Sequence, residues 1–304
     1  MKCGGAIAVI SLIALLAGCA GGEPDAMSVS FLDPLTNDPA AIDAENPPMV
    51  KEITVPTADG SRMSGRFLLA GGAGPHPAIL LLHGYPGTET NLDIAQMLRR
   101  AGYNVLFIHY RGAWGSEGKY SIAHMIEDAA AALAWLRSGA EPRVDAAHII
   151  AIGHSMGGMA ALLTAENDTG LACVAGWTPA DGNLVATGFD TPENAEGFAA
   201  YTDNLVMLGG ASGASIVADI RAHRGDYDVA GKAAGLKGKA VLLVGARGDE
   251  VLPVEEFHNR LETALRAQPG IKLTSLLLDG DHSFSWRRVA LARVTLNWLD
   301  ANCR

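Results

Sequence analysis

Three side chains in the sequence have the types and the order of an acyl-transfer site. Ser155 lies in GHSMG, Asp249 in ARGDEVLP and His282 in DGDHSFSW. A serine hydroxyl is a weak nucleophile until a histidine accepts its proton, and a carboxylate is needed to hold that histidine in the correct tautomer. Ser155 is therefore a candidate nucleophile, and His282 and Asp249 are candidates for the base and the acid.

Alternatives exist for the base and the acid. Glu250, next to Asp249, is the rival acid, whereas Asp279 and Asp281 lie too near His282 in sequence for the usual geometry. The chain has nine histidines, and the positions of several others indicate structural roles: His83, His148, His154 and His258.

The elements that must position these residues alternate along the chain. Two strands with a turn at Asp59-Gly60 are predicted between residues 50 and 70. Continuous apolar runs then predict buried strands, and the segments between them predict helices. The strands are 78–84, 104–110, 148–153, 171–177, 240–245 and 272–280, and the helices are 90–101, 121–139, one from about 156, 254–267 and about 284–299. Such alternation predicts a parallel sheet covered on both faces, with residues 179–225 as an insertion.

Ser155 falls between a buried strand and a helix in this order. A sharp strand-to-helix turn forces its central residue into a strained backbone conformation and crowds the residues two positions away. Gly153 and Gly157 relieve that crowding, and the turn raises the Ser155 hydroxyl above the carboxyl edge of the sheet. The amide of Met156, at the start of the helix, is a candidate oxyanion donor.

With these motifs the sequence resembles the α/β-hydrolase superfamily over residues 51–301, near its dienelactone-hydrolase-like esterases and serine aminopeptidases. The resemblance implies an eight-stranded, mostly parallel sheet with helices on both faces and a small helical cap insertion at about 179–225. It also implies the order serine, acid, histidine, which this chain follows, although Gly245 stands one residue further from Asp249 than in the common form. By the same resemblance the second oxyanion donor is the Tyr85 amide, in a loop shaped by His83 and Gly84.

The predicted function is hydrolysis of an ester with an uncharged, small or medium acyl group. An aminopeptidase is the alternative, and it would need a carboxylate for the substrate amine; the candidates in the cap are Asp181, Asp190, Glu193 and Glu196. A non-catalytic envelope lipoprotein with this fold is the second alternative. No C-x-x-C, H-E-x-x-H or Walker-type glycine loop occurs, so the sequence predicts no metal or nucleotide cofactor.

The first residues predict export and lipidation. Lys2 precedes an apolar run over 6–17 that ends in Leu-Ala-Gly-Cys19, which resembles a bacterial lipobox. An ordinary secretory signal is the alternative. We expect a signal peptide over 1–18, acylation of Cys19, a tether over 19–49 and a hydrolase domain over 50–302. Because Ala20 is not aspartate, we expect the outer rather than the inner membrane of a bacterial cell envelope.

Charge and cysteine content bound the partners. The formal net charge of −10 argues against binding to nucleic acid or to an anionic lipid surface, so membrane contact would come from the acyl chains. We expect Cys173, in an apolar run, to be a buried thiol rather than paired with Cys303.

Arg111 is predicted to brace its loop, while Trp114 is equally compatible with lining the pocket and with packing. The oligomeric state is left open.

Overall fold

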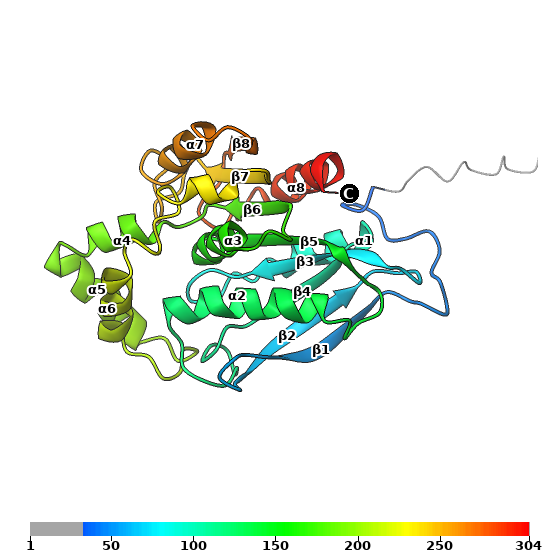
Figure 1. Ribbon diagram of the computed structural model, residues 1–304, viewed down its shortest axis with the longest axis horizontal. Coiled ribbons are helices and arrows are strands. Elements are labelled where there is room, and N and C mark those ends of the chain that lie inside the picture. The colour runs from blue at the N-terminus through cyan, green and yellow to red at the C-terminus, as the bar shows by residue number, and fades with distance from the viewer. Residues whose placement is uncertain (1–32, 304) are drawn as a thin grey trace, which may run out of the picture.

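A single eight-stranded sheet forms the centre of the molecule in the computed structural model, which describes residues 33–303 (Figure 1). The strand order is β1-β2-β4-β3-β5-β6-β7-β8, and β2 alone runs antiparallel to its neighbours. The predicted eight-stranded, mostly parallel sheet is confirmed. The strands are β1 (Met49–Pro56), β2 (Arg62–Leu69), β3 (His76–Leu82), β4 (Asn104–Ile108), β5 (Val144–His154), β6 (Cys173–Trp177), β7 (Ala240–Ala246) and β8 (Lys272–Leu278).

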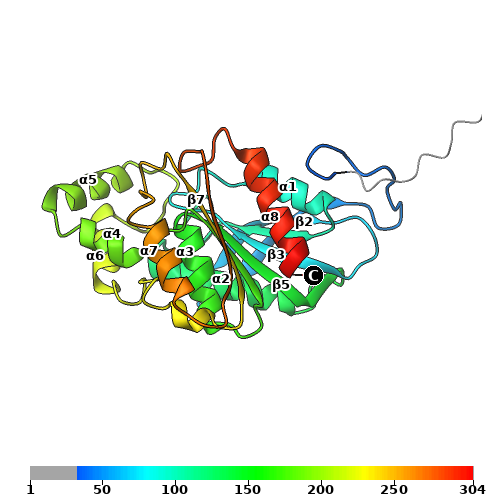
Figure 2. The same cartoon turned by 90° about the horizontal axis from the view of Figure 1, so that it is seen from above.

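Helices cover both faces of this sheet because its central strands are apolar on both sides. All residues of β4, β6 and β7 are buried. On one face lie α1 (Leu92–Arg100) and α8 (Arg288–Asn302), and on the other lie α2 (Ile122–Arg137), α3 (Met156–Asn167) and α7 (His258–Arg266) (Figure 2). Each group packs into its own apolar cluster with the strand residues that face it.

Two helices begin four residues later than the sequence predicts, and α1 begins two residues later. The helix expected from 254 begins at His258, because Val254 accepts its bond from Asn259, five residues on, which is not the helical spacing. The helix expected from about 284 begins at Arg288, since Phe284 has a φ of 55° that a right-handed helix does not allow. By contrast, α2 begins as predicted, with the Ser121 hydroxyl accepting a bond from the His124 amide at 3.0 Å.

The insertion after β6 forms a helical cap over the carboxyl end of the sheet (Figure 1). It contains α4 (Gly182–Gly188), α5 (Pro192–Asp203) and α6 (Gly213–Ala222) and is followed by a 3-10 turn, η1 (Ala233–Leu236). Backbone bonds fasten the segment between α5 and α6 to the loop after β4: the Gly209 amide donates to the Gly112 carbonyl at 2.6 Å, and the Trp114 amide donates to Met207 at 2.9 Å. The cap is therefore attached to the body away from its two chain ends.

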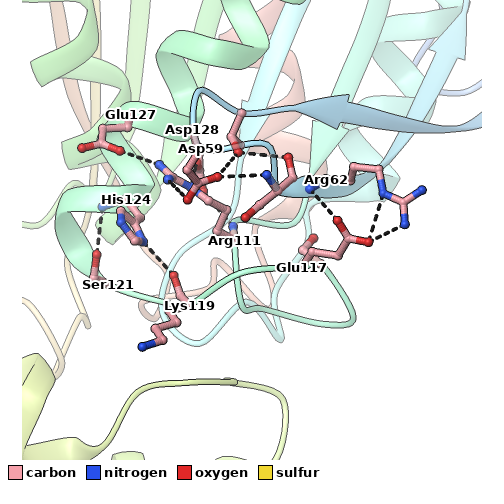
Figure 3. Close-up of polar contacts among 12 residues, drawn as sticks. Asp59, Arg62, Arg111, Glu117, Lys119, Ser121, His124, Glu127 and Asp128 are labelled. Atoms are coloured by element: carbon pink, nitrogen blue, oxygen red, sulfur yellow. Dashed lines mark hydrogen bonds and ion pairs between the residues drawn. The ribbon is translucent and has the colours of Figure 1, made fainter.

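Arg111 braces the loop that carries the cap, as predicted (Figure 3). Its buried guanidinium donates to Asp128 and Glu127 at 2.6 Å each and to Asp59 at 2.9 Å. These three acids come from α2 and from the turn between β1 and β2. A buried charge with three such partners fixes the loop, and removing Arg111 would leave the buried Asp128 carboxylate without its ion pair.

The prediction for Cys173 is wrong: it forms a disulfide with Cys303. The two residues are 130 positions apart in sequence, and their Cα atoms are 6.0 Å apart. The bond ties the start of β6 to the end of α8, a proximity that depends on the fold and not on spacing. The apolar surroundings that suggested a buried thiol accommodate the disulfide equally well.

Residues 33–48 run along the side of α1 and α8. Arg100 donates to the Pro34 carbonyl at 2.8 Å, and Arg293 pairs with Asp33. The predicted signal peptide and Cys19 lie outside the described residues. Within residues 33–303, no helix is long and apolar enough to cross a bilayer.

Candidate active site

Ser155 stands on a strained turn between β5 and α3. Its backbone has φ 57° and ψ −125°, outside the regions that residues with a side chain normally occupy. A Cβ on Gly153 would overlap the Gly157 carbonyl, and a Cβ on Gly157 would overlap the carbonyls of Leu82 and His83. Only glycine fits at these two positions, so the sequence pattern around Ser155 follows from the tightness of the turn.

The structure brings Ser155, His282 and Asp249 together at the carboxyl edge of the sheet. His282 Nε2 lies 2.9 Å from Ser155 Oγ, and His282 Nδ1 lies 2.7 Å from Asp249 Oδ2. Because a carboxylate only accepts, the imidazole proton is on Nδ1, which leaves Nε2 free to accept the serine proton. The other oxygen, Asp249 Oδ1, accepts from the amides of Val251 and Leu252 at 2.9 and 2.8 Å, while Glu250 is exposed.

Two residues hold the His282 loop: His154, for which the sequence indicated a structural role, and Thr178, which the sequence analysis did not single out. His154 Nε2 donates to the His282 carbonyl at 2.8 Å, and the Thr178 hydroxyl donates to the same oxygen at 3.3 Å. Thr178, like Ser155 and Phe284, has a positive φ, so three strained residues surround His282. The sequence feature that could have identified Thr178 is its position immediately after β6 and before Pro179.

Two buried histidines make the folded protein sensitive to acid. Burial lowers the pKa of His83 and of His154 to about 3 in each case. In the unfolded chain each would have a pKa of about 6.5, so the unfolded state takes up these protons first as the pH falls. We expect the free energy of unfolding to fall by up to about 1.4 kcal/mol per pH unit for each ring as pH drops from about 6 towards 3.

Urea denaturation at several pH values between about 6 and 4.5 measures how the free energy of unfolding depends on pH. This interval lies above the range in which most carboxylates titrate. His154→Gln keeps a donor for the His282 carbonyl and should make the slope shallower. The matched control is His76→Gln, at a histidine whose ring contacts the Gly72 carbonyl, and it should change the slope less than His154→Gln does. Equal slopes for wild type and His154→Gln would show that burial of this ring does not control the acid response.

The loop after β3, residues 83–87, runs directly against the Ser155 turn. A Cβ on Gly84 would lie 2.8 Å from Ser155 Cβ. His83 Nδ1 donates to the Gly84 carbonyl at 2.7 Å, and the Tyr110 hydroxyl donates to the His83 carbonyl at 3.1 Å. The predicted donors, the amides of Tyr85 and Met156, thus come from two segments that flank the nucleophile, and His83 and Gly84 belong to the same loop as Tyr85.

A cavity of about 490 Å³ opens at Ser155 under the cap. Its wall is mostly apolar, and Glu89 is the sole carboxylate among the described residues that line it. The cap contributes Phe198 and Tyr201 from α5. The residues at the cavity are Gly84, Tyr85, Pro86, Gly87, Thr88, Glu89, His154, Ser155, Met156, Ala180, Val185, Phe198, Tyr201, Val251, Leu252, His282 and Ser283.

Three aromatic side chains of the cap and the neighbouring loop lie outside the cavity wall. Trp177, at the root of the cap, is fully buried in the core, and Phe189 is buried beside Phe198. Trp114 lies outside the cavity wall; its indole nitrogen donates to the Pro86 carbonyl at 2.8 Å. Trp114 therefore supports the loop after β3 and does not line the pocket.

None of the four cap carboxylates considered for an aminopeptidase lines the cavity. Asp181 is buried, caps α4 and pairs with Arg260 at 2.8 Å, and Asp190 pairs with Arg224 at 3.0 Å. Glu193 and Glu196 are exposed and lie outside the cavity wall. Within residues 33–303, no group of histidine, cysteine, aspartate or glutamate side chains could hold a metal ion.

Comparisons with known proteins agree with this architecture. The family described as X-Pro dipeptidyl-peptidase (S15 family) matches residues 59–188. Two uncharacterized proteins from two strains of Mycobacterium tuberculosis are each 33% identical over 116 residues, which are 38% of this chain. The match spans 41% of the length of those relatives.

Solved structures extend the similarity to most of the chain. The Pyrococcus furiosus esterase Pf2001 superimposes with a TM-score of 0.63 and 19% identity, covering 88% of this chain and 100% of that one. The Pyrococcus horikoshii acylaminoacyl peptidase gives a TM-score of 0.63 at 14% identity, covering 84% of this chain and 42% of that one. At such identities the similarity establishes the fold.

Proposed function

We propose that this chain, which has the α/β-hydrolase fold, is a serine hydrolase that cleaves carboxylic esters through an acyl-enzyme. Ser155 Oγ attacks the ester carbonyl carbon while its proton passes to His282 Nε2. The carbon–oxygen bond to the alcohol then breaks, and His282 returns the proton to the leaving oxygen. Water, deprotonated by His282, next attacks the acyl-enzyme and releases the acid.

The observation that carries this proposal is the unbroken series of hydrogen bonds from Ser155 through His282 to Asp249. It combines a nucleophile, a base and an orienting acid beside a cavity large enough for a small substrate. The amides of Tyr85 and Met156 would hold the oxyanion, where one donor is worth about 2.7 to 4 kcal/mol in the transition state.

The cavity wall supports an ester with an uncharged, small or medium acyl group. Tyr85 and Phe198 stack at 5.4 Å between ring centroids, and Val185, Met156 and Leu252 add aliphatic surface. Burying apolar groups on such a wall contributes about 25 cal/mol per Å². A charged acyl group would lose its hydration there without a matching partner.

An amide hydrolase acting on peptides with a free amino end is the second candidate. The match to the dipeptidyl-peptidase family favours it, as does Glu89 in the cavity wall, which could hold an ammonium group. That carboxylate is already engaged, because Glu89 Oε1 accepts from the Asn91 amide at 2.7 Å and lies 3.8 Å from the Arg288 guanidinium. We therefore favour the ester.

Hydrolysis of p-nitrophenyl esters and of aminoacyl p-nitroanilides separates the two candidates. We expect kcat/KM to be higher for p-nitrophenyl butyrate than for the anilides, and Glu89→Gln to leave ester turnover within about threefold of wild type. Turnover confined to the anilides, and lost in Glu89→Gln, would replace the esterase by the peptidase.

We also propose that the protein is anchored in the cell envelope by acylation of Cys19, with the outer membrane favoured. The Cys173–Cys303 disulfide supports an oxidising compartment. Wild type expressed in a bacterial host should partition into detergent and carry the mass of the acyl chains on Cys19, the first residue after cleavage. The Cys19→Ser variant should do neither. Detergent partitioning of Cys19→Ser equal to that of wild type would remove the lipid anchor from the proposal.

A further inference from the structure

The loop that carries the proposed oxyanion donor is held from two sides. From the body, Tyr110 donates to the His83 carbonyl at 3.1 Å and Trp114 donates to the Pro86 carbonyl at 2.8 Å. From the cap, the Thr202 hydroxyl lies 2.6 Å from the hydroxyl of Tyr85. Tyr85 therefore has its amide next to the nucleophile turn and its hydroxyl bound to the cap.

The contact between Tyr85 and Thr202 is partly shielded from water. Thr202 is 3% exposed, and the Tyr85 ring is stacked on Phe198, which belongs to the same helix α5, with an interplanar angle of 28°. Burial raises the pKa of Tyr85 to about 12, so its hydroxyl stays protonated and able to donate at neutral pH. Breaking this partly buried hydrogen bond is costly, because the buried Thr202 hydroxyl would lose its partner.

The support that α5 offers is itself fixed. Asp203, next to Thr202, accepts from the Gly213 amide at the start of α6 at 2.6 Å. Further along, the amides of Gly209 and Trp114 bind the cap to the loop that Arg111 braces. Thr202 thus holds the Tyr85 side chain at a defined height above the sheet.

A small displacement of this loop would matter for chemistry. The loop touches the nucleophile turn at Gly84, so a shift of Tyr85 would move its amide relative to the oxygen that becomes charged. Oxyanion donors act because they are already in place before the charge develops, and loss of one costs about 10²- to 10³-fold in kcat. A donor that is displaced but still present should lower kcat by a smaller factor, about tenfold.

We propose that Thr202 is a positioning residue: by binding the Tyr85 hydroxyl, it fixes the Tyr85 amide as an oxyanion donor and links the cap to the chemical step. This inference rests on the proposed function. Through this bond the cap influences kcat, in addition to any influence that it has on substrate choice. The effect passes through Tyr85, and Thr202 itself touches no reacting atom.

The experiment uses the full-length protein in detergent and the variants Thr202→Val, Thr202→Ser, Tyr85→Phe and the Thr202→Val/Tyr85→Phe double variant. Two readouts are taken well below the Tm of each variant: kcat and KM on p-nitrophenyl butyrate, and the second-order rate constant for inactivation by a fluorophosphonate. The second needs no natural substrate, because phosphonylation of Ser155 also develops negative charge on an oxygen. The matched control is Thr187→Val, an exposed threonine on cap helix α4.

We expect Thr202→Val and Tyr85→Phe each to lower kcat and the inactivation rate constant about tenfold, with KM within about twofold of wild type. The double variant should be no worse than the poorer single variant, because both remove the same bond. Thr202→Ser keeps the hydroxyl and should recover most of the activity, and Thr187→Val should match wild type.

Three results would overturn the inference while leaving the proposed function intact: wild-type kcat in Thr202→Val, a loss in Thr202→Ser as large as in Thr202→Val, or losses that multiply in the double variant. If Thr202→Val fails to fold, Tyr85→Phe and Thr202→Ser decide between the same outcomes. Equal fluorophosphonate labelling of wild type and Ser155→Ala would overturn the proposed function and this inference together.

Discussion

Replacement of Ser155 by alanine is expected to lower kcat on an ester by about 10⁶-fold. The change removes the only oxygen that lies within hydrogen-bonding distance of His282 Nε2 in the described residues 33–303. Alanine keeps the Cβ and suffers no more strain at a φ of 57° than serine does, so the fold should be retained. Steady-state hydrolysis of p-nitrophenyl butyrate, with circular dichroism as a check on folding, measures this.

The residual activity of Ser155→Ala is informative. A site that keeps its oxyanion donors and binding surface should still exceed the uncatalysed rate by about 10³- to 10⁴-fold. The control is Ser138→Ala, an exposed serine at the end of α2, which should retain wild-type kcat. A fall of less than about tenfold in Ser155→Ala would mean that another group attacks the ester.

The second large effect is expected for Asp249→Asn, with a fall in kcat of about 10⁴-fold. Asp249 Oδ2 accepts the proton of His282 Nδ1, while its other oxygen accepts two backbone amides. Asparagine has one acceptor oxygen. If that oxygen keeps the two amides, its NH₂ group faces Nδ1 and favours the tautomer with the proton on Nε2, which cannot accept the Ser155 proton.

Glu250→Gln is the matched control for this prediction, because Glu250 is the neighbouring acid and is exposed. We expect its kcat to stay within about twofold of wild type. Measuring kcat against pH for both variants separates a tautomer defect, which persists at every pH, from a shifted titration. The opposite ranking, with Glu250→Gln the more damaged variant, would reassign the acid to Glu250.

Much of the candidate site could be predicted from sequence because its residues stand where buried strands end. The carboxyl ends of β5, β7 and β8 meet at one edge of the sheet, so Ser155, Asp249 and His282 had to lie close together once the strands were recognised. Glycine at positions 153 and 157 could be interpreted from the sequence as a requirement of a tight turn, and in the structure a Cβ at either position overlaps a carbonyl. Periodicity and turn chemistry are local signals, and Ser155, Asp249 and His282 each follow a strand that such signals predict.

The features that sequence analysis missed depend on contacts between distant segments. Cys173 and Cys303 are joined across 130 residues, and nothing in either neighbourhood indicates the other. Thr202 reaches Tyr85 across 117 residues and lies in a helix whose periodicity says nothing about its partner. Trp114 and Asp181 looked like possible pocket residues, but tertiary hydrogen bonds commit each of them to structural support.

The central claim is that Ser155 is an activated nucleophile, and covalent labelling tests it most directly. Full-length protein in detergent is treated with a fluorophosphonate, digested and analysed by mass spectrometry, with Ser155→Ala treated in parallel. We predict a single adduct on the peptide that contains Ser155 and no labelling of Ser155→Ala. An unlabelled wild type, or an adduct that persists in Ser155→Ala, would contradict the claim and favour a non-catalytic protein or a different nucleophile.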